Sequence, residues 1–282
     1  MFSFLTEFFQ KKKIDLFAPI PLSACEIRKS YLLEHEGIEK GTVIMLAVPY
    51  LTEACLDPDR NISAYAVSRD YHGFYRALFD ELLPLLRERY PNERFAGFAD
   101  HSPIAELQSA ARAGLGVIGQ NGLLITDRYS SYVFLGEIIT TAEIPCSAGE
   151  IRSCSGCGKC RRECPMGQIG TCLSALTQKK GVLTESEQAF ILRFGSAWGC
   201  DICQEVCPHT QQAIRNGTIF SPIPYFAQDT VSHLTAQTVR SMDDASFASR
   251  AYAWRGRETI LRNLQLLENA EKERQKGEPC SN

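Results

Sequence analysis

The spacing of the cysteines between residues 154 and 207 constrains this chain more than any other feature. One run spells C-x2-C-x2-C-x3-C-P and a later run spells C-x2-C-x3-C-P, with a single cysteine between the runs. The residues are Cys154, Cys157, Cys160, Cys164, Cys172, Cys200, Cys203 and Cys207. Two- and three-residue spacings let successive thiolates converge on one cube of iron and sulfide. The sequence therefore predicts two [4Fe–4S] clusters.

The same pattern predicts which cysteines share a cluster. In two-cluster ferredoxins, the cysteine that precedes the proline ligates the other cluster. The first three cysteines are therefore expected to take Cys207 as their fourth ligand. Cys164 is expected to cross to the later run, where Cys172 completes the second set. The two expected ligand sets are Cys154, Cys157, Cys160 and Cys207, and Cys164, Cys172, Cys200 and Cys203.

Two other uses of cysteine fit the chain less well. A disulfide framework is typical of short secreted chains, whereas this chain has 282 residues and opens without a signal-peptide pattern. Structural zinc takes paired C-x2-C knuckles and leaves the third cysteine and the two Cys-Pro endings unexplained. Four cysteines lie outside the pattern: Cys25, Cys55 and Cys146, which are expected to be buried inert thiols, and Cys280, which lies in a polar tail.

Composition and charge exclude several classes of protein. A hydrophobic share of 44% with 22% charged residues is typical of a globular protein, and the length allows one large domain or two modest ones. The net charge of −3 gives no overall basic field for nucleic acid, so any such contact must be a local patch. No run reaches the roughly 18 apolar residues of a membrane span. Cysteine-rich chains without a secretion signal indicate a reducing, cytoplasmic setting.

Hydrophobic periodicity predicts an α+β chain. The first residues are expected to form an amphipathic helix, and Thr42–Val48 a strand that is buried on both faces. The longest helical signal runs from Ser63 to Tyr90, with a kink or break at Pro84. Its apolar stripe consists of Phe74, Leu78, Leu82 and Leu85. The other expected elements are strands at 14–18, 95–99, 121–126 and 132–139, helices at 23–36 and 104–112, and a helical segment at 235–273.

The last of these segments carries a local concentration of positive charge. Acidic residues interleave with the arginines, which favours an ordinary solvated helix over a binding surface. The arginines are Arg250, Arg255, Arg257 and Arg262.

Two further patterns mark candidate sites. Asp100 follows an expected strand and precedes a helix that Ser102 can cap, which is where open α/β sheets bind ligands. An aspartate there is more often only a cap or a turn former. Gly114, Gly116 and Gly119 spell G-x-G-x-x-G, but this motif follows a helix and runs into a strand, so we reject a dinucleotide-binding interpretation. The glycines are instead expected to let the backbone approach a bulky ligand closely.

Several stretches resemble the epoxyqueuosine reductase family, which is related to the reductive dehalogenases. Residues 62–72 (ISAYAVSRDYH) are similar to the family's ISxYAxGRDYH segment, and residues 100–106 (DHSPIAE) to its D-x-x-P-x-x-E segment. Residues 111–125 (ARAGLGVIGQNGLLI) are similar to its RAGLGWIGKNTxLI segment, and residues 255–263 (RGRETILRN) to its closing R-x-LRN helix. The cysteine motifs also match in order, so the resemblance covers most of the chain.

The resemblance implies three domains. Residues 1–147 would form an α/β cobalamin- and substrate-binding domain with a nitroreductase-like sheet and flanking helices. Residues 148–220 would form a ferredoxin-like domain with two [4Fe–4S] clusters. Residues 221–282 would form a linker and a short helical segment.

The resemblance also implies an activity. Members of the family remove the epoxide oxygen of epoxyqueuosine in tRNA, the last step of queuosine synthesis, with electrons passed from the clusters to cobalamin. The implied partners are tRNA and an external electron donor such as flavodoxin or ferredoxin. Asp100 matches the family's proton donor, and a carboxyl that donates near neutral pH needs a raised pKa, which burial against an apolar corrin can supply. The implied cofactor contacts are Arg69, Tyr71, His72, Asp100, Ser102, Gly114, Gly116, Gly119 and Asn121.

Two rival functions stay open. One is a corrinoid iron–sulfur reductase that acts on a small molecule, and the other is a non-catalytic two-cluster electron carrier. The region between Ser23 and Gly41 lacks a segment that helps to enclose cobalamin in the family, so both alternative functions stay open. Asp100 and the glycine loop favour an enzyme, because a carrier needs neither. An arginine-lined approach would favour tRNA, since phosphate contacts supply most non-specific affinity.

Overall fold

The structure is a computed structural model that describes residues 1–167 and 172–277. Its contacts divide the chain into two compact units, and each unit is assembled from three separate stretches. The first unit comprises Met1–Leu51, Tyr71–Cys160 and Gln204–Pro224, and the second comprises Thr52–Asp70, Arg161–Cys203 and the chain from Tyr225 onward. The expected division at residues 147 and 220 stays a prediction, and the segment between those positions contributes to both units.

The first unit is built around a four-stranded antiparallel sheet with the strand order β1-β2-β6-β3. Every residue of β2 is buried, as expected for a strand covered on both faces. A sheet with only antiparallel neighbours is not the open parallel sheet whose strand ends bind ligands, so that argument for Asp100 was wrong. The strands of this sheet are β1 (Phe17–Pro21), β2 (Thr42–Pro49), β3 (Phe95–Phe98) and β6 (Val133–Thr140).

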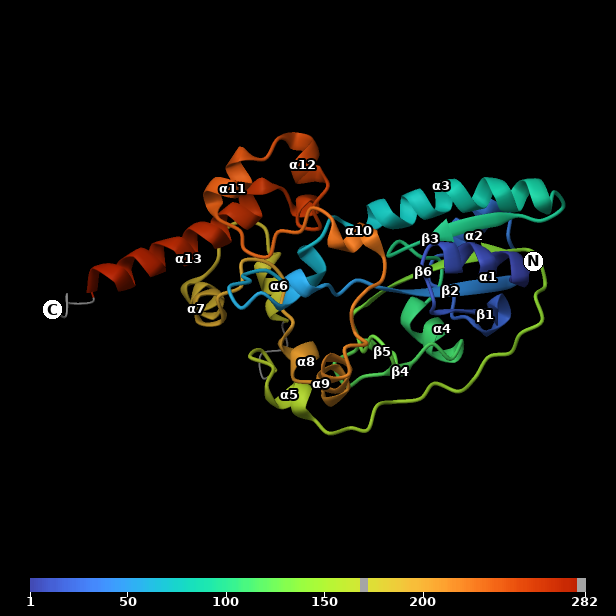
Figure 1. Ribbon diagram of the computed structural model, residues 1–282, viewed down its shortest axis with the longest axis horizontal. Helices are drawn as coiled ribbons and strands as arrows, with labels where there is room; N and C mark the ends of the chain where they lie inside the picture. Colours follow the sequence, from blue (N-terminus) through green and yellow to red (C-terminus); the bar gives the residue numbers. More distant parts are fainter. Residues whose placement is uncertain (168–171, 278–282) are drawn as a thin grey trace. The chain divides into compact units, whose positions relative to one another are not determined.

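Helices cover the two faces of this sheet (Figure 1). On one face, α3 lays the rings of Tyr75 and Phe79 directly over Gly136 and Gly97, where a Cβ atom would stand only 2.5 and 2.6 Å from the ring atoms. On the other face, α2 and α4 enclose an apolar core that includes Met45, Leu33 and Ile139. The helices of the first unit are α1 (Phe2–Lys11), α2 (Ser30–Glu36), α3 (Tyr71–Arg89), α4 (Glu106–Arg112) and α9 (Pro208–Arg215).

Several expected boundaries were wrong for identifiable reasons. The strand expected at 14–18 lies instead at Phe17–Pro21 and contains Pro19 and Pro21, because β1 is an edge strand that tolerates residues without an N–H. The helix expected from Ser63 begins only at Tyr71, and within its stripe Leu85 is exposed while Leu86 is buried. Ser102 does not cap α4, which begins at Glu106 after Ala105.

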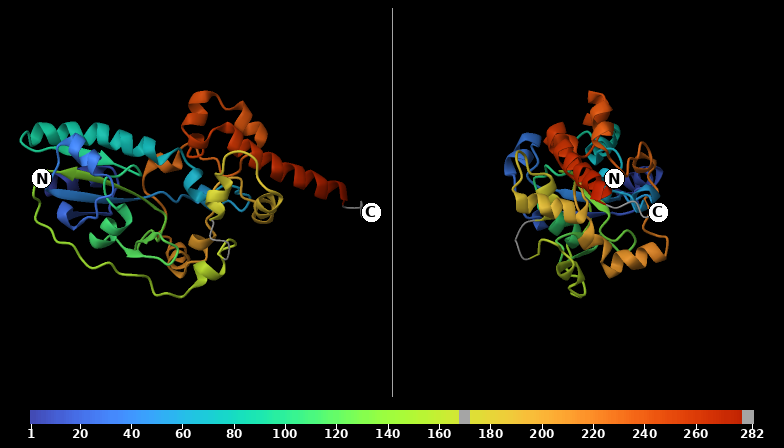
Figure 2. Two further views of the ribbon diagram at one scale, coloured as in Figure 1. Left: turned by 180° about the vertical axis from the view of Figure 1, so that it is seen from behind. Right: turned by 90° about the vertical axis from the view of Figure 1, so that its left-hand side faces the viewer.

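A short hairpin follows α4. The strands β4 (Val117–Ile118) and β5 (Leu124–Ile125) pair antiparallel, so the glycine motif follows a helix and enters strands, as expected. An extended connection then leads from β6 back past this hairpin (Figure 2). The Ile118 N–H donates to the Arg152 carbonyl at 2.8 Å, and the Cys154 N–H donates to the Ile118 carbonyl at 3.0 Å. The hairpin therefore fixes the entry to the first cysteine run.

The second unit is helical. The segment from 235 to 273 is mostly helical, as expected, but it consists of separate helices, one of which Asp243 caps with its side chain. Its elements are α6 (Leu173–Thr177), α7 (Glu185–Phe194), α11 (Ala236–Ser241), α12 (Asp244–Ala248) and α13 (Arg257–Gly277), with 3-10 turns η2 (Glu53–Leu56), η3 (Ala64–Ala66) and η4 (Ala253–Arg255). Three short helices span a boundary between units: α5 (Lys159–Arg162), α8 (Ile202–Glu205) and α10 (Pro224–Ala227).

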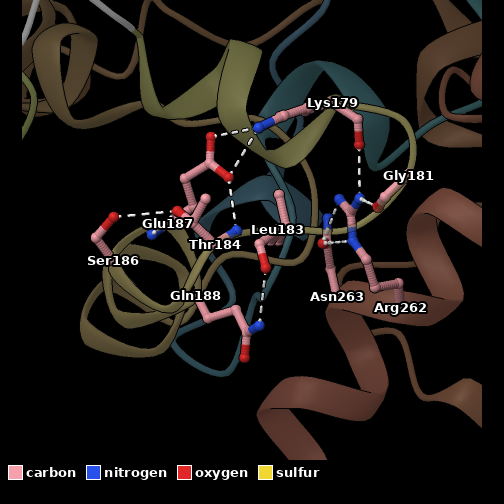
Figure 3. Close-up of polar contacts among 9 residues, drawn as sticks. All are labelled: Lys179, Gly181, Leu183, Thr184, Ser186, Glu187, Gln188, Arg262 and Asn263. Atoms are coloured by element: carbon pink, nitrogen blue, oxygen red, sulfur yellow. Dashed lines mark hydrogen bonds and ion pairs between the residues drawn. The ribbon is translucent and has the colours of Figure 1, made fainter.

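Helix α13 holds the loop between α6 and α7 (Figure 3). The Arg262 guanidinium donates to the carbonyls of Lys179 and Gly181 at 2.7 and 2.5 Å. The Asn263 side chain, which is fully buried, donates to the carbonyls of Thr177 and Ala197. Arg262 therefore serves the fold rather than a free basic face.

Among the residues described, no helix is both long enough and apolar enough to cross a membrane.

Candidate functional site

The first expected ligand set lies together within the first unit. Its four cysteines line one hollow, together with Gln120 and His209. Cys207 is the N-cap of α9, with Pro208 in the first turn, so the helix starts where the thiol is presented. Gly156 and Gly158 take φ values of +72° and +73°, which only glycine adopts without strain, and they turn the chain between successive cysteines. The ligand role of this set stays a prediction.

The second expected ligand set lies within the second unit. Burial is the main cause that raises the pKa of the Cys200 thiol to about 11 and that of the Cys203 thiol to about 12. The neighbouring thiols of Cys164 and Cys172 raise both values further, which means that the four sulfur atoms share one environment. Thiols bind metal as thiolates, so occupation of this set by iron must release protons. Four soft sulfur donors suit an iron–sulfur cluster.

Neither set is arranged like a site for a single metal ion. Within residues 1–167 and 172–277, no three His, Cys, Asp or Glu side chains converge closely enough to hold one ion. The thiolates of a [4Fe–4S] cluster each bind a different iron, so they stand farther apart than the ligands of one zinc ion.

A buried ion pair supports the second set. Asp201, between Cys200 and Cys203, is 5% exposed and accepts hydrogen bonds from the Arg60 guanidinium and the Ala64 N–H, both at 2.6 Å, and from the Ser63 hydroxyl at 2.5 Å. Two of these partners, Ser63 and Ala64, are the N-cap and the first residue of η3. The turn at η3 therefore fixes the loop that carries two of the expected ligands.

Replacing Asp201 with asparagine is expected to lower the free energy of unfolding by about 3 kcal/mol, because one member of a buried ion pair is left without its charge partner. Denaturant titration of the anaerobic protein measures this change. Asp244→Asn is the matched control, because Asp244 pairs with Arg257 at a fully exposed position, and it should leave the free energy of unfolding almost unchanged. Equal, small effects of the two substitutions would contradict the supporting role.

Asp100 lies in the loop that follows β3. Its side chain is 72% exposed, and His72 Nε2 lies 3.7 Å from Asp100 Oδ2. Protein atoms therefore do not bury this carboxyl, and desolvation of it would have to come from a bound ligand. Tyr71 lies against the His72 ring, with ring centroids 4.1 Å apart, and stacks on Phe134 at the same distance. The Tyr71 ring therefore belongs to a stack of aromatic rings beside the loop that carries Asp100.

Three other expected cofactor contacts lie in different parts of the chain. Ser102 is buried, and its hydroxyl is hydrogen-bonded to Glu137. Arg69 belongs to the second unit, where it pairs with Asp229 and lies over the Tyr225 ring. Asn121 lines the hollow of the first cysteine set. Their roles as cofactor contacts stay predictions.

The glycine motif packs mainly against the chain itself. A Cβ atom on Gly116 would stand 2.4 Å from the Ile125 carbonyl, and one on Gly119 would stand 2.3 Å from the Asn121 side chain. Gly116 is therefore required by the β4–β5 hairpin, because its neighbour is backbone, whereas the neighbours of Gly119 are side-chain atoms that can move. Only Gly114 among the three faces open space, with φ +82°, and can admit a ligand as the sequence suggested.

Two glutamates behind Asp100 were missed. Glu137 is fully buried in β6, where desolvation raises its pKa well above the usual range. Glu106 begins α4, and burial raises its pKa to about 7. A charged residue inside the apolar run of β6 was a visible signal for the first, and the last position of the D-x-x-P-x-x-E segment was a signal for the second.

Comparison with known proteins identifies relatives over most of the chain. A family described as "Epoxyqueuosine reductase QueG, DUF1730" matches residues 38–101. The epoxyqueuosine reductase of Gloeobacter violaceus is 31% identical over 217 residues, which cover 73% of this chain and 68% of that protein. The epoxyqueuosine reductase of Listeria monocytogenes is 31% identical over 207 residues, but this chain spans only 54% of its length.

Solved structures show that the fold is shared. The epoxyqueuosine reductase of Streptococcus thermophilus matches with a TM-score of 0.75 at 23% identity, over 99% of this chain and 86% of that chain. An epoxyqueuosine reductase crystallised with an epoxyqueuosine-modified tRNA-Tyr stem loop matches with a TM-score of 0.72 at 24% identity, over 94% of this chain and 81% of that chain. Both comparisons support the mixed α/β architecture.

Proposed function

This chain belongs to the epoxyqueuosine reductase family, and we propose that it reduces epoxyqueuosine in tRNA to queuosine. The observation that carries the proposal is the arrangement of the cysteines, because two separate sets of four thiols each gather within one compact unit. Two [4Fe–4S] clusters held there would accept electrons from an external donor such as flavodoxin or ferredoxin. The crystallised relative with a modified tRNA stem loop supports tRNA as the substrate.

The proposed reaction sets clear demands on the protein. Removing the epoxide oxygen as water takes two electrons and two protons and leaves a carbon–carbon double bond. Cobalamin, when bound, supplies a cobalt centre that accepts electrons and acts as a nucleophile. Tyr71 and His72, the aromatic residues beside Asp100, would help to hold this cofactor there. The chain must bind and orient the substrate, and it must deliver a proton to the departing oxygen.

Asp100 is the residue we assign to proton delivery. Its exposed carboxyl reaches into the space beside His72, so a substrate oxygen can approach it. A corrin and a nucleoside that close over it would remove it from water, and desolvation favours the protonated, donating form of a carboxyl. The high exposure of the Asp100 side chain to solvent is therefore compatible with a role in proton delivery.

An anaerobic turnover experiment tests the proposal against its rivals. The chain is reconstituted with iron, sulfide and cobalamin and is given a reductant and tRNA that bears epoxyqueuosine. Formation of queuosine, measured by mass spectrometry of the nucleosides, is the expected result. Uptake of cobalamin without product would favour a reductase of small molecules, and failure to take up cobalamin would favour a two-cluster electron carrier; either result contradicts the proposal.

A further inference from the structure

Glu137 is a buried acid with an unusual environment. It lies in the middle of β6, paired across the sheet with Met45 of β2 and Phe98 of β3, and it is 0% exposed. Its Oε1 accepts a hydrogen bond from the Ser102 hydroxyl. Its Oε2 is buried and has no hydrogen-bond donor among the described residues. A charged carboxylate in this position would be costly, so the group is held in its neutral form.

Glu106 lies between Glu137 and Asp100. Its Oε1 accepts a hydrogen bond from the backbone N–H of Asp100 at 3.3 Å, and its carboxyl lies next to the carboxyl of Glu137. Two neighbouring buried carboxyl groups repel each other if both are charged, so one of them stays protonated. Glu137 is the more deeply buried of the two, so it carries the proton and is placed to donate it in a hydrogen bond to the Glu106 carboxylate.

The backbone of Asp100 needs such an anchor. Its φ is +65°, in the left-handed region that residues other than glycine rarely adopt. A strained conformation of this kind persists only where the surrounding structure holds it. Glu106 accepts a hydrogen bond from the N–H of Asp100 itself. The anchoring bond is therefore formed at the residue whose backbone is strained.

We propose that Glu106 is the positioning residue for Asp100, and that neutral Glu137 holds the Glu106 carboxylate from the core side. The carboxylate of Glu106 fixes the Asp100 peptide and thereby aims the Asp100 side chain. The inference rests on the proposed function, because it matters for turnover only if Asp100 delivers the proton.

The pH dependence of this anchor follows from the groups around it. The negative charge of Asp100 disfavours the charged form of Glu106. Lys29 and the neighbouring Glu137 acid favour that charged form. Tyr75 and Cys25 lie near Glu137 and stay neutral, because burial raises the pKa of each. Since the pKa of Glu106 is about 7, the anchoring carboxylate is gained as the pH rises through neutrality. Removing the Glu137 donor should move this gain to higher pH.

Four variants test the inference. Glu106→Ala is expected to lower kcat about tenfold with little change in KM, the effect of losing one hydrogen bond to a charged acceptor. Glu106→Gln keeps an acceptor oxygen without the charge, so it should recover only part of kcat and should lose the pH dependence across neutrality. Glu137→Gln keeps a donor and should retain the wild-type pH profile, whereas Glu137→Leu should shift its ascending limb to higher pH. Glu88→Ala, at an exposed position of α3, is the matched control.

Hydrogen exchange gives a readout that does not depend on activity. In Glu106→Ala the amide of Asp100 is expected to exchange about tenfold faster, because its acceptor is gone. Wild-type exchange at Asp100 together with wild-type kcat in Glu106→Ala would overturn the inference. If Asp100→Asn retains turnover, the proposed role of Asp100 fails instead, and the exchange rate still decides whether Glu106 anchors the loop.

Discussion

Asp100→Asn is expected to abolish turnover of epoxyqueuosine tRNA while both clusters and cobalamin still bind. An amide has almost the same shape as the carboxyl but cannot deliver a proton to the departing oxygen. General acids typically contribute 10²–10⁴-fold to a rate, so a loss of about 10³-fold in kcat is expected. Single-turnover nucleoside analysis measures the rate, and visible absorption of the reconstituted protein measures the cofactors.

The matched control for this substitution is Asp127→Asn, at an exposed position of the same unit. It should leave the rate unchanged. Turnover by Asp100→Asn at the wild-type rate would remove Asp100 from the mechanism. Loss of cobalamin in that variant would assign Asp100 to cofactor binding rather than to proton delivery.

Cys157→Ser and Cys203→Ser are each expected to remove one cluster and to abolish turnover. Each substitution replaces a soft thiolate in a different set of four, so each variant should keep about half of the wild-type iron, the content of one cube. Iron and sulfide analysis after anaerobic reconstitution measures this loss. The combined variant should bind no cluster.

Cys146→Ser is the control for the cysteine variants, because Cys146 lies outside both sets and should not affect iron content. Full iron content in either single variant would show that the replaced residue is not a ligand. Loss of all iron in one variant would mean that the two sets do not assemble independently.

Residue spacing predicted the parts of this protein that depend on local chemistry. The spacing of the two cysteine runs predicted that Cys207 lies beside the set of three cysteines that ends at Cys160. This could be predicted because the crossover rule is a property of the motif itself. The buried strand β2 was also predictable, since every residue from Thr42 to Val48 is apolar or β-branched.

The parts that depend on tertiary contacts could not be predicted in the same way. Ser102 was expected to cap a helix, but its hydroxyl donates a hydrogen bond to the buried Glu137, which lies 35 residues further along the chain. Gly116 and Gly119 looked like a ligand loop, but their close neighbours are the facing strand and the Asn121 side chain. The support of Asp201 by Arg60 depends on a contact across 141 residues of chain. No local sequence pattern indicates contacts between residues that lie so far apart in the sequence.

The most direct test of the proposed function is the yield of queuosine in a single anaerobic turnover. The fully reconstituted chain is mixed with an anticodon stem loop that bears epoxyqueuosine, and in parallel with the free epoxyqueuosine nucleoside. We expect queuosine from the stem loop, with no product from Asp100→Asn or from Cys203→Ser. Absence of queuosine from a chain that holds both clusters and cobalamin would contradict the proposed function.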